Sequence, residues 1–152
     1  LGGKPVVPQA IPAHVGVVPA WWHELHGLVA AMEGRLQPAV DSLSAARDAD
    51  VTSWTVAYNL AGVLSSAGGH DRAREELEEA DRRVREFGNA VGAGGLDTRQ
   101  ATARIRTRLG EVRWRSGDLA GAWRDLEFAT ELDPAYTRAR VMIDRLVNAT
   151  GN

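Results

Sequence analysis

Apolar residues recur along this chain at intervals of three and four positions, the spacing that gathers side chains on one face of an α-helix. Clear examples are the runs Ala73, Leu77, Ala80, Val84, Phe87 and Ala101, Ile105, Leu109, Val112. The pattern predicts helices at about residues 20–33, 37–48, 53–66, 71–87, 97–116, 119–131 and 137–148. Most of the intervals between them contain glycine or proline, which interrupt helices. The chain is therefore expected to be all-α.

A glycine, an alanine, a leucine and a second alanine recur three times in the same order and at the same offsets. The copies are Gly34–Ala39–Leu43–Ala46, Gly68–Ala73–Leu77–Ala80 and Gly117–Ala122–Leu126–Ala129. The second copy follows the first after 34 residues, and the third follows after 49, which is one period plus an insertion of 15. Glycine permits a tight turn with positive φ, and a small alanine lets two helices cross closely. A period of this length predicts a stack of two-helix units.

The third copy carries further residues of a known repeat pattern. They are Leu109-Gly110, Gly117-Asp118, Ala122, Leu126, Ala129 and Glu131-Leu132-Asp133-Pro134. This set resembles the tetratricopeptide repeat, which runs leucine-glycine, glycine-aspartate, alanine, a large apolar residue, alanine and proline. The second copy matches more weakly, and the first has His26 where leucine is usual and lacks the closing proline. The resemblance covers roughly residues 20–136.

The resemblance implies a helical-hairpin solenoid of three helix pairs, completed by a C-terminal capping helix. We expect units at about residues 20–53, 54–87 and 103–136, with an insertion at 88–102 and the capping helix at 137–150. In the final helix, the expected buried side is Ala139, Ile143, Leu146 and Val147, with Arg138, Arg140 and Arg145 elsewhere. The resemblance also implies a scaffold module that binds a protein or a peptide in its concave groove.

Residues 1–19 are expected to form an extended segment, because Pro5, Pro8, Pro12 and Pro19 block a regular helix. Valine and isoleucine residues lie between these prolines and would be poorly solvated on a free tail. Three interpretations stay open. The segment is a linker, an arm that occupies the chain's own groove, or an arm exchanged with a second copy to form a homodimer.

Composition excludes several classes of protein. The chain has 152 residues, enough for one domain with a continuous stacked core. Its 18 Lys and Arg against 20 Asp and Glu give a net charge of −2, so no overall field selects nucleic acid or an acidic membrane. It has no cysteine, which excludes disulfides, thiolate zinc sites and cysteine nucleophiles. We expect a cytoplasmic protein with neither nucleic acid nor a membrane as its partner.

Two alternatives to a free-standing binding module follow from particular residues. The chain begins at Leu1 rather than at methionine, so we expect a piece of a longer protein, for example a sensor or interaction arm of a larger regulator. The more remote alternative is a zinc-dependent hydrolase using His23 and His26. Their spacing is i, i+3, whereas the zinc-peptidase motif needs histidines at i and i+4. We therefore predict no enzymatic activity, no metal site and no cofactor.

The candidate ligand-binding residues come from the repeat register. Arg104, Arg108 and Arg115 share one helix face, away from the apolar stripe of the same helix. One subgroup of tetratricopeptide proteins holds a peptide's terminal carboxylate with an asparagine and two basic residues, and the resemblance places Asn59, Arg104 and Arg108 at such positions. Two further clamp positions fall on Glu24 and Leu28, which do not match. Glu111 is placed to neutralise the arginines locally.

Large apolar residues also fall on groove-facing positions of the register. These are Trp21, Met32, Tyr58 and Trp114. We expect the aromatic residues to supply apolar anchors for a partner. The partner is predicted to be acidic or to dock through its C-terminal carboxylate.

Three acid-to-base pairs at i, i+4 follow one another in the helix predicted at residues 71–87. They are Glu78–Arg82, Glu79–Arg83 and Asp81–Arg85. Such pairs are typical of a solvated helix face, and we expect them to lie on the outside of the stack.

Overall fold

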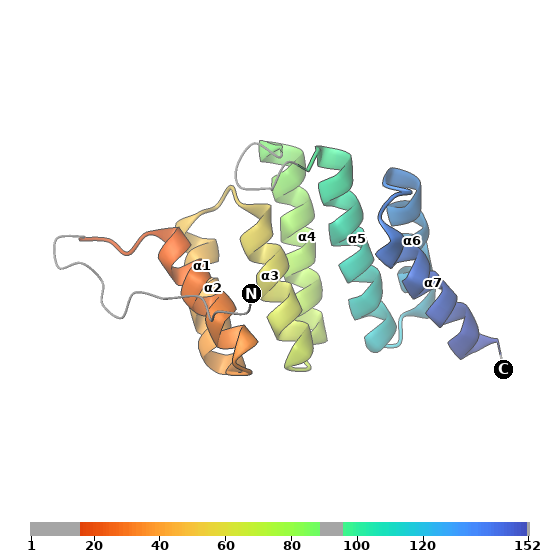
Figure 1. The fold of residues 1–152 in the computed structure, drawn as a ribbon, viewed down its shortest axis with the longest axis horizontal. Coiled ribbons are helices and arrows are strands. Elements are labelled where there is room, and N and C mark those ends of the chain that lie inside the picture. The colour runs from red at the N-terminus through yellow and green to blue at the C-terminus, as the bar shows by residue number, and fades with distance from the viewer. Residues whose placement is uncertain (1–15, 89–95, 152) are drawn as a thin grey trace, which may run out of the picture.

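A computed structural model describes residues 16–88 and 96–151, and within these ranges the regular secondary structure is entirely α-helical. The helices are α1 (Ala20–Met32), α2 (Leu36–Ala49), α3 (Trp54–Ser66), α4 (His70–Phe87), α5 (Thr98–Arg115), α6 (Leu119–Leu132) and α7 (Thr137–Thr150), as Figure 1 shows. Every predicted helix end lies within two residues of the observed one. Residues 16–19 are not helical, and the rest of the predicted extended segment lies outside the described residues.

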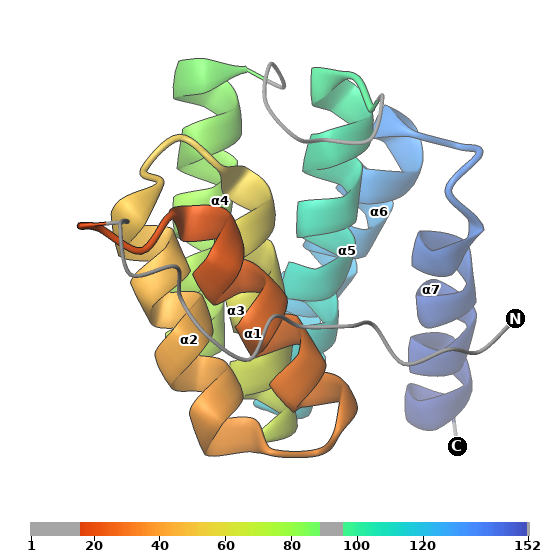
Figure 2. The ribbon, with the colours of Figure 1, turned by 60° about the vertical axis from the view of Figure 1, so that its left-hand side comes forward.

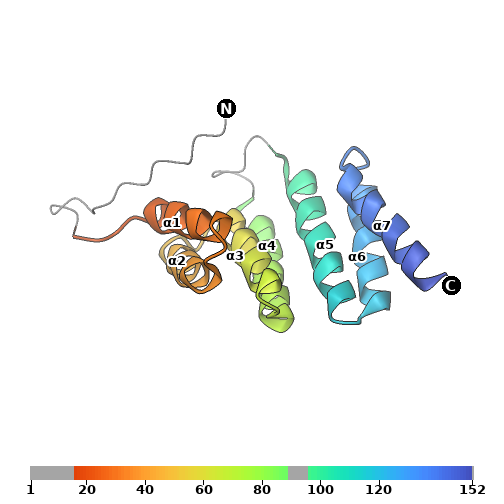
Figure 3. The same cartoon turned by 60° about the horizontal axis from the view of Figure 1, so that its bottom comes forward.

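The helices form three antiparallel hairpins, α1/α2, α3/α4 and α5/α6, which are stacked in chain order and followed by α7 (Figure 2). The first helices of the hairpins are neighbours, because α1 contacts α3, α3 contacts α5 and α5 contacts α7. We call the side formed by α1, α3, α5 and α7 the inner face, and the side formed by α2, α4 and α6 the outer face (Figure 3). The predicted solenoid of three helix pairs with a capping helix is confirmed.

The repeated glycines and alanines play the structural roles that their spacing predicts. Gly34, Gly68 and Gly117 have φ angles of 74°, 83° and 91°, a backbone conformation that is costly for residues with a Cβ. The repeated alanines and leucines are completely buried where the two helices of each hairpin meet: Ala39, Leu43, Ala46, Ala73, Leu77, Ala80, Ala122, Leu126 and Ala129. Each hairpin is therefore held by close helix packing around small side chains.

The insertion lengthens α4 and α5 to 18 residues each. Gly88, with a φ of 67°, ends α4. The predicted capping box opens α5: the Gln100 amide donates to the Asp97 carboxylate at 2.8 Å, and the Asp97 amide donates to the Gln100 side chain at 3.0 Å. Val84 and Ala101 are buried in the same core, so the added turns extend the hydrophobic packing rather than projecting into solvent.

The capping helix α7 buries a slightly different stripe from the one predicted. Ala139, Met142 and Leu146 are buried, whereas Val147 is exposed and Ile143 is half-buried. The prediction was wrong for Val147, because the helix is turned so that Met142, which the predicted stripe left out, is buried instead. Met142 and Leu146 pack against the buried residues of α6, so α7 covers the end of the third hairpin.

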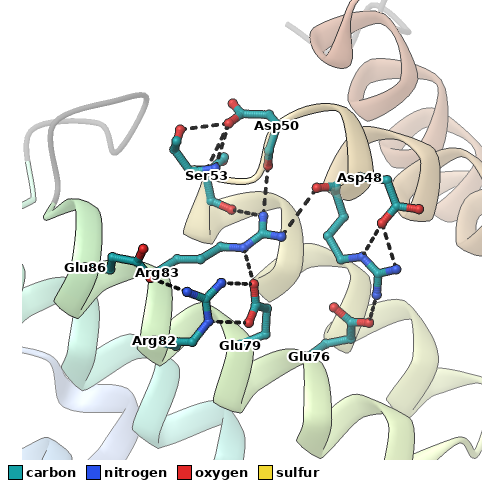
Figure 4. A network of polar contacts seen from close by, with 10 residues as sticks. Asp48, Asp50, Ser53, Glu76, Glu79, Arg82, Arg83 and Glu86 are labelled. Carbon is teal, nitrogen blue, oxygen red and sulfur yellow. Dashed lines mark hydrogen bonds and ion pairs between the residues drawn. The ribbon is translucent and has the colours of Figure 1, made fainter.

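A buried arginine joins the first two hairpins on the outer face (Figure 4). Arg83 of α4 is only 4% exposed. Its Nη1 donates to the carbonyls of Asp50 and Ser53, both at 2.9 Å, in the loop between α2 and α3. The expectation that Arg83 lies on a solvated face was wrong, because the loop from the preceding hairpin covers it.

The neighbouring Arg82 is exposed and pairs along its own helix. It contacts Glu79 and Glu86 rather than the predicted Glu78. Glu79 also accepts from Arg83 Nε at 2.7 Å. Hydrogen bonds from Arg82, opposed by partial burial and reinforced by Arg83, lower the pKa of Glu79 from 4.5 to about 2. Glu79 therefore stays ionised and holds both guanidinium groups in place.

A second polar network joins α4, α5 and α6. Arg106 of α5 lies 3.2 Å from both the Asp81 and the Asp125 carboxylates, which belong to α4 and α6. Arg113 Nη1 lies 2.9 Å from the second oxygen of Asp125. Burial raises the pKa of Asp125 in spite of the two arginines. Asp81 was also expected on a solvated face but is buried, because α5 packs over it.

The hairpin contact makes a direct stability prediction. Ala122→Leu should destabilise the protein by about 1–3 kcal/mol, because the added methyl groups have no room between α5 and α6. Ala120→Leu, at an exposed position of the same helix, is the control. Thermal unfolding measures both variants. Equal midpoints for Ala122→Leu and the parent protein would contradict the close helix contact.

The buried side chain of Arg83 leads to a second stability prediction. Arg83→Met should lower the free energy of unfolding by about 3 kcal/mol, since two carbonyls of the α2–α3 loop would lose their donor at about 1–3 kcal/mol each. Arg82→Met, which removes the adjacent exposed guanidinium, should change stability little. Urea titration of the two variants compares them. Similar losses from both would show that Arg83 has no special role in joining the hairpins.

Candidate functional site

Two adjoining cavities open on the inner face between α3, α5 and α7. The first, of about 250 Å³, is lined by Gly62, Ser65, Ser66, Arg108, Glu111, Val112, Arg115 and Arg138. The second, of about 230 Å³, is lined by Glu111, Trp114, Arg115, Met142 and Arg145. Because Glu111 and Arg115 line both, the cavities lie side by side, and we call the two together the arginine groove.

The arginine groove is strongly cationic although the chain as a whole carries a charge of −2. Arg108, Arg115, Arg138 and Arg145 line it, and Glu111 is its single acidic lining residue, which leaves a formal charge of +3. Low-dielectric walls concentrate such a field and attract counter-ions. The groove is therefore suited to an anionic group.

Glu111 organises two of the four arginines. Its Oε1 accepts from Arg115 Nη2 at 3.0 Å, and its Oε2 accepts from Arg138 Nη2 at 3.1 Å. The hydrogen bond to Glu111 raises the pKa of Arg138. Arg115 Nη1 also lies 3.4 Å from the hydroxyl of Ser65. Glu111 thus joins α5 to α7 across the floor of the groove.

Arg108 is held in a defined position against α3. Its guanidinium carbon lies 3.7 Å from the centre of the Tyr58 ring, and Nη1 donates to the Tyr58 carbonyl at 2.8 Å. Gly62 makes room for it, since a Cβ at that position would lie 3.0 Å from Arg108 Nη1. Within residues 16–88 and 96–151, neither Arg108 nor Arg145 forms an ion pair with a carboxylate. Both keep charge available for a ligand.

Comparison with solved structures identifies the architecture. Protein-family models give no match to the chain, and no curated protein matches it. The first tetratricopeptide domain of Spaghetti (RPAP3) bound to the HSP90 peptide SRMEEVD superposes with a TM-score of 0.71 at 19% identity, covering 93% of this chain and 100% of that one. The Arabidopsis OM64 tetratricopeptide domain gives 0.70 at 17%, covering 86% and 95%. The chain has the tetratricopeptide-repeat fold.

A third match comes from the N-terminal domain of stress-induced protein-1 of C. elegans. It has a TM-score of 0.69 at 16% identity and covers 84% of this chain and 93% of that one. At these identities the likeness shows the fold alone.

Of the three residues that the tetratricopeptide resemblance places in a carboxylate clamp, the structure brings only Arg108 into the groove. Asn59 instead hydrogen-bonds to Glu24 of α1, whose pKa is raised by burial and lowered in part by that bond. Arg104 pairs with Asp133 at 3.2 Å and lies over the ring of Tyr136 at 4.5 Å. Asn59 and Arg104 line neither cavity. Both have partners within the repeats.

The predicted apolar anchors lie at different places on the inner helices. Trp114 lines the second cavity, and Tyr58 supports Arg108. Trp21 and Met32 belong to α1 and are 58% and 76% exposed. The Trp21 ring meets Trp22 edge-on at 5.8 Å. Trp21 and Met32 line neither cavity of the arginine groove.

Sequence reasoning missed two of the four groove arginines, Arg138 and Arg145, because it treated α7 only as a capping helix. The repeat period carried a signal for the first of them. Arg138 stands 34 residues after Arg104, which is one tetratricopeptide unit further along the chain. The same register extended into α7 would have placed a basic residue on the inner face there.

The histidine pair receives no metal-binding support from its surroundings. His26 lies against Trp22 with ring centres 4.8 Å apart, and its buried Nε2 has no hydrogen-bond partner among the described residues. No cluster of three histidine, aspartate or glutamate residues suited to a metal exists in the described part of the chain.

None of the helices described has the length and apolarity to cross a membrane.

The packing of Gly62 under Arg108 leads to a prediction that needs no ligand. Gly62→Ala should push the guanidinium away from the Tyr58 ring, because the new Cβ would be only 3.0 Å from Nη1. The ring-current shift of the Arg108 side chain should then decrease in the NMR spectrum. Ser66→Ala, one turn further along α3, is the control. An unchanged Arg108 shift in Gly62→Ala would contradict the stacked geometry.

Proposed function

We propose that this tetratricopeptide-repeat chain is a protein-interaction module that holds an acidic segment or a C-terminal carboxylate of a partner in the arginine groove. The observation that carries the proposal is the lining of that groove, four arginines against one glutamate in a chain of net negative charge. An arginine guanidinium forms paired hydrogen bonds with a carboxylate, which gives both affinity and orientation.

The arrangement of the arginines supports binding of more than one carboxylate. Arg108 and Arg145 lie on different helices, and the cavity that each one lines also contains Arg115. Arg108 is already positioned by Tyr58, so little side-chain freedom is lost when it meets a ligand. A peptide with adjacent acidic residues would contact α5 and α7 together.

The comparisons support this proposal at the level of the fold. The Spaghetti domain was solved with a bound peptide, SRMEEVD, that contains two glutamates and an aspartate. In our proposal the present chain binds its partner on the inner face through basic residues of α5 and α7. The hypothesis that Asn59 and Arg104 act as clamp residues is not needed for it.

A matched pair of variants tests the proposal. The double variant Arg108→Gln, Arg115→Gln should weaken binding of a fluorescent glutamate-rich peptide at least tenfold, about 1.4 kcal/mol, and should flatten its salt dependence. Arg140→Gln, which removes an exposed charge of α7 that lines neither cavity, should change both little. Fluorescence anisotropy at several salt concentrations measures binding, and thermal unfolding checks folding. Equal affinity in the folded double variant and the parent protein would exclude the groove as the binding site.

A further inference from the structure

The helix α1 presents an exposed apolar surface at the end of the inner face opposite to α7. Trp21, Leu25 and Met32 lie at i, i+4 and i+11 and therefore share one side of α1. Met32 and Trp21 are the most exposed large hydrophobic residues of any helix in the described ranges. Leu25 between them is half-buried. We call these three residues the α1 apolar surface.

The repeat register places this surface in line with the arginines. Thr55 follows Trp21 by 34 residues, which is one repeat period. Arg104 follows Thr55 by 49 residues, which is one period plus the insertion of 15. The three residues therefore occupy equivalent positions of successive units. Met32, Ser66 and Arg115 are related in the same way. Arg115 and Ser66 line the arginine groove, so the equivalent side of α1 also belongs to the inner face.

The character of the inner face therefore changes along the stack. It is apolar on α1, small and polar on α3, and cationic on α5 and α7. Single exposed apolar residues are common on proteins and need no explanation. Here, however, the two most exposed apolar residues of the described helices, Trp21 and Met32, lie on one side of α1. That side belongs to the same inner face as the arginine groove, which favours one ligand that contacts both the α1 apolar surface and the groove.

We infer that the ligand is a bipartite peptide: an acidic segment in the arginine groove joined to a large apolar side chain that packs on the α1 apolar surface. This inference rests on the proposed function and adds to it the composition and the length of the bound segment. Charge complementarity fixes the acidic part to α5 and α7, and burial of apolar area then favours an aromatic or long aliphatic residue beside Leu25, in contact with either Trp21 or Met32, since these two lie about 16 Å apart along α1.

Helix spacing sets the distance between the two parts of the ligand. Packed helices lie about 8–10 Å apart, so α1 and α5, with α3 between them, are separated by about 20 Å. An extended peptide covers about 3.3 Å per residue. About six residues are therefore needed between the acidic segment and the apolar side chain. Ser66 of α3, which lines the groove, has a small exposed side chain, so α3 leaves room for a peptide backbone to pass there.

A series of synthetic peptides tests the spacing with the full chain. Each peptide has a fluorescent label, a block of glutamates and one phenylalanine placed about three, six or nine residues from the block in a glycine-serine spacer, in both chain orders. The peptide without phenylalanine is the reference. We expect phenylalanine at the spacing of about six to tighten binding about tenfold in at least one order, equivalent to about 1.4 kcal/mol, and the other spacings to add less.

Variants of α1 identify the surface that gives this gain. One of the two variants Trp21→Ala and Met32→Ala, at the end of α1 where phenylalanine binds, should remove most of its gain, and both should leave the affinity of the reference peptide unchanged. Phe128→Ala removes an aromatic side chain that is 42% exposed on the outer helix α6, and it should preserve the gain. Thermal unfolding confirms that all three variants are folded.

The outcomes separate this inference from the proposed function. If the reference peptide binds through the arginines but phenylalanine adds nothing, or adds equally at every spacing, the bipartite ligand is wrong and the acidic site stands. The bipartite ligand is also wrong if the gain survives Trp21→Ala and Met32→Ala. It is wrong as well if the parent protein is a dimer that Trp21→Ala makes monomeric, because a second copy then occupies the α1 apolar surface. If no glutamate-rich peptide binds, both proposals fail.

Discussion

The close approach of two helix backbones at completely buried alanines is the constraint on which this structure depends. The two helices of each hairpin can come this close because the residue between them is Ala39, Ala73 or Ala122. A larger side chain would not fit there. The same contact fixes how the first helix of each hairpin is presented on the inner face. The side chains of α1, α3 and α5 therefore occupy equivalent places, and their differences in chemistry become differences along a single surface.

The stack is joined by two kinds of polar contact that differ in physical character. Arg83 ties the first hairpin to the second through neutral backbone carbonyls, which keep their hydrogen-bonding capacity at any pH. Arg106 ties the second hairpin to the third through the buried carboxylate of Asp81, and with Arg113 it also pairs with the buried carboxylate of Asp125 inside the third hairpin. The arginine groove lies beside the second kind of junction, on the opposite side of α5.

The sequence predicted the fold closely because the information was local and repeated. Glycine at each turn and alanine at each crossing can be recognised from their offsets alone. The fate of Arg83 could not be predicted in this way, since its burial depends on where the loop of another hairpin passes. Asn59 and Arg104 fitted a known clamp by position, but Glu24 and Asp133, far away in the chain, hold them in the structure. Arg145 entered the groove through the packing of α7, which no pattern within one repeat describes.

Glu111 gives the groove a resting state of its own. By holding Arg115 and Arg138, its carboxylate acts as an internal ligand that any incoming acid has to displace or share. Binding is then an exchange of one anion for another, and a solitary carboxylate gains little by it. A ligand with several acidic groups engages Arg108 and Arg145 in addition, which Glu111 does not occupy. Under the proposed function, the groove would therefore favour a ligand with several acidic groups over a single carboxylate, and Glu111 alone would set this preference.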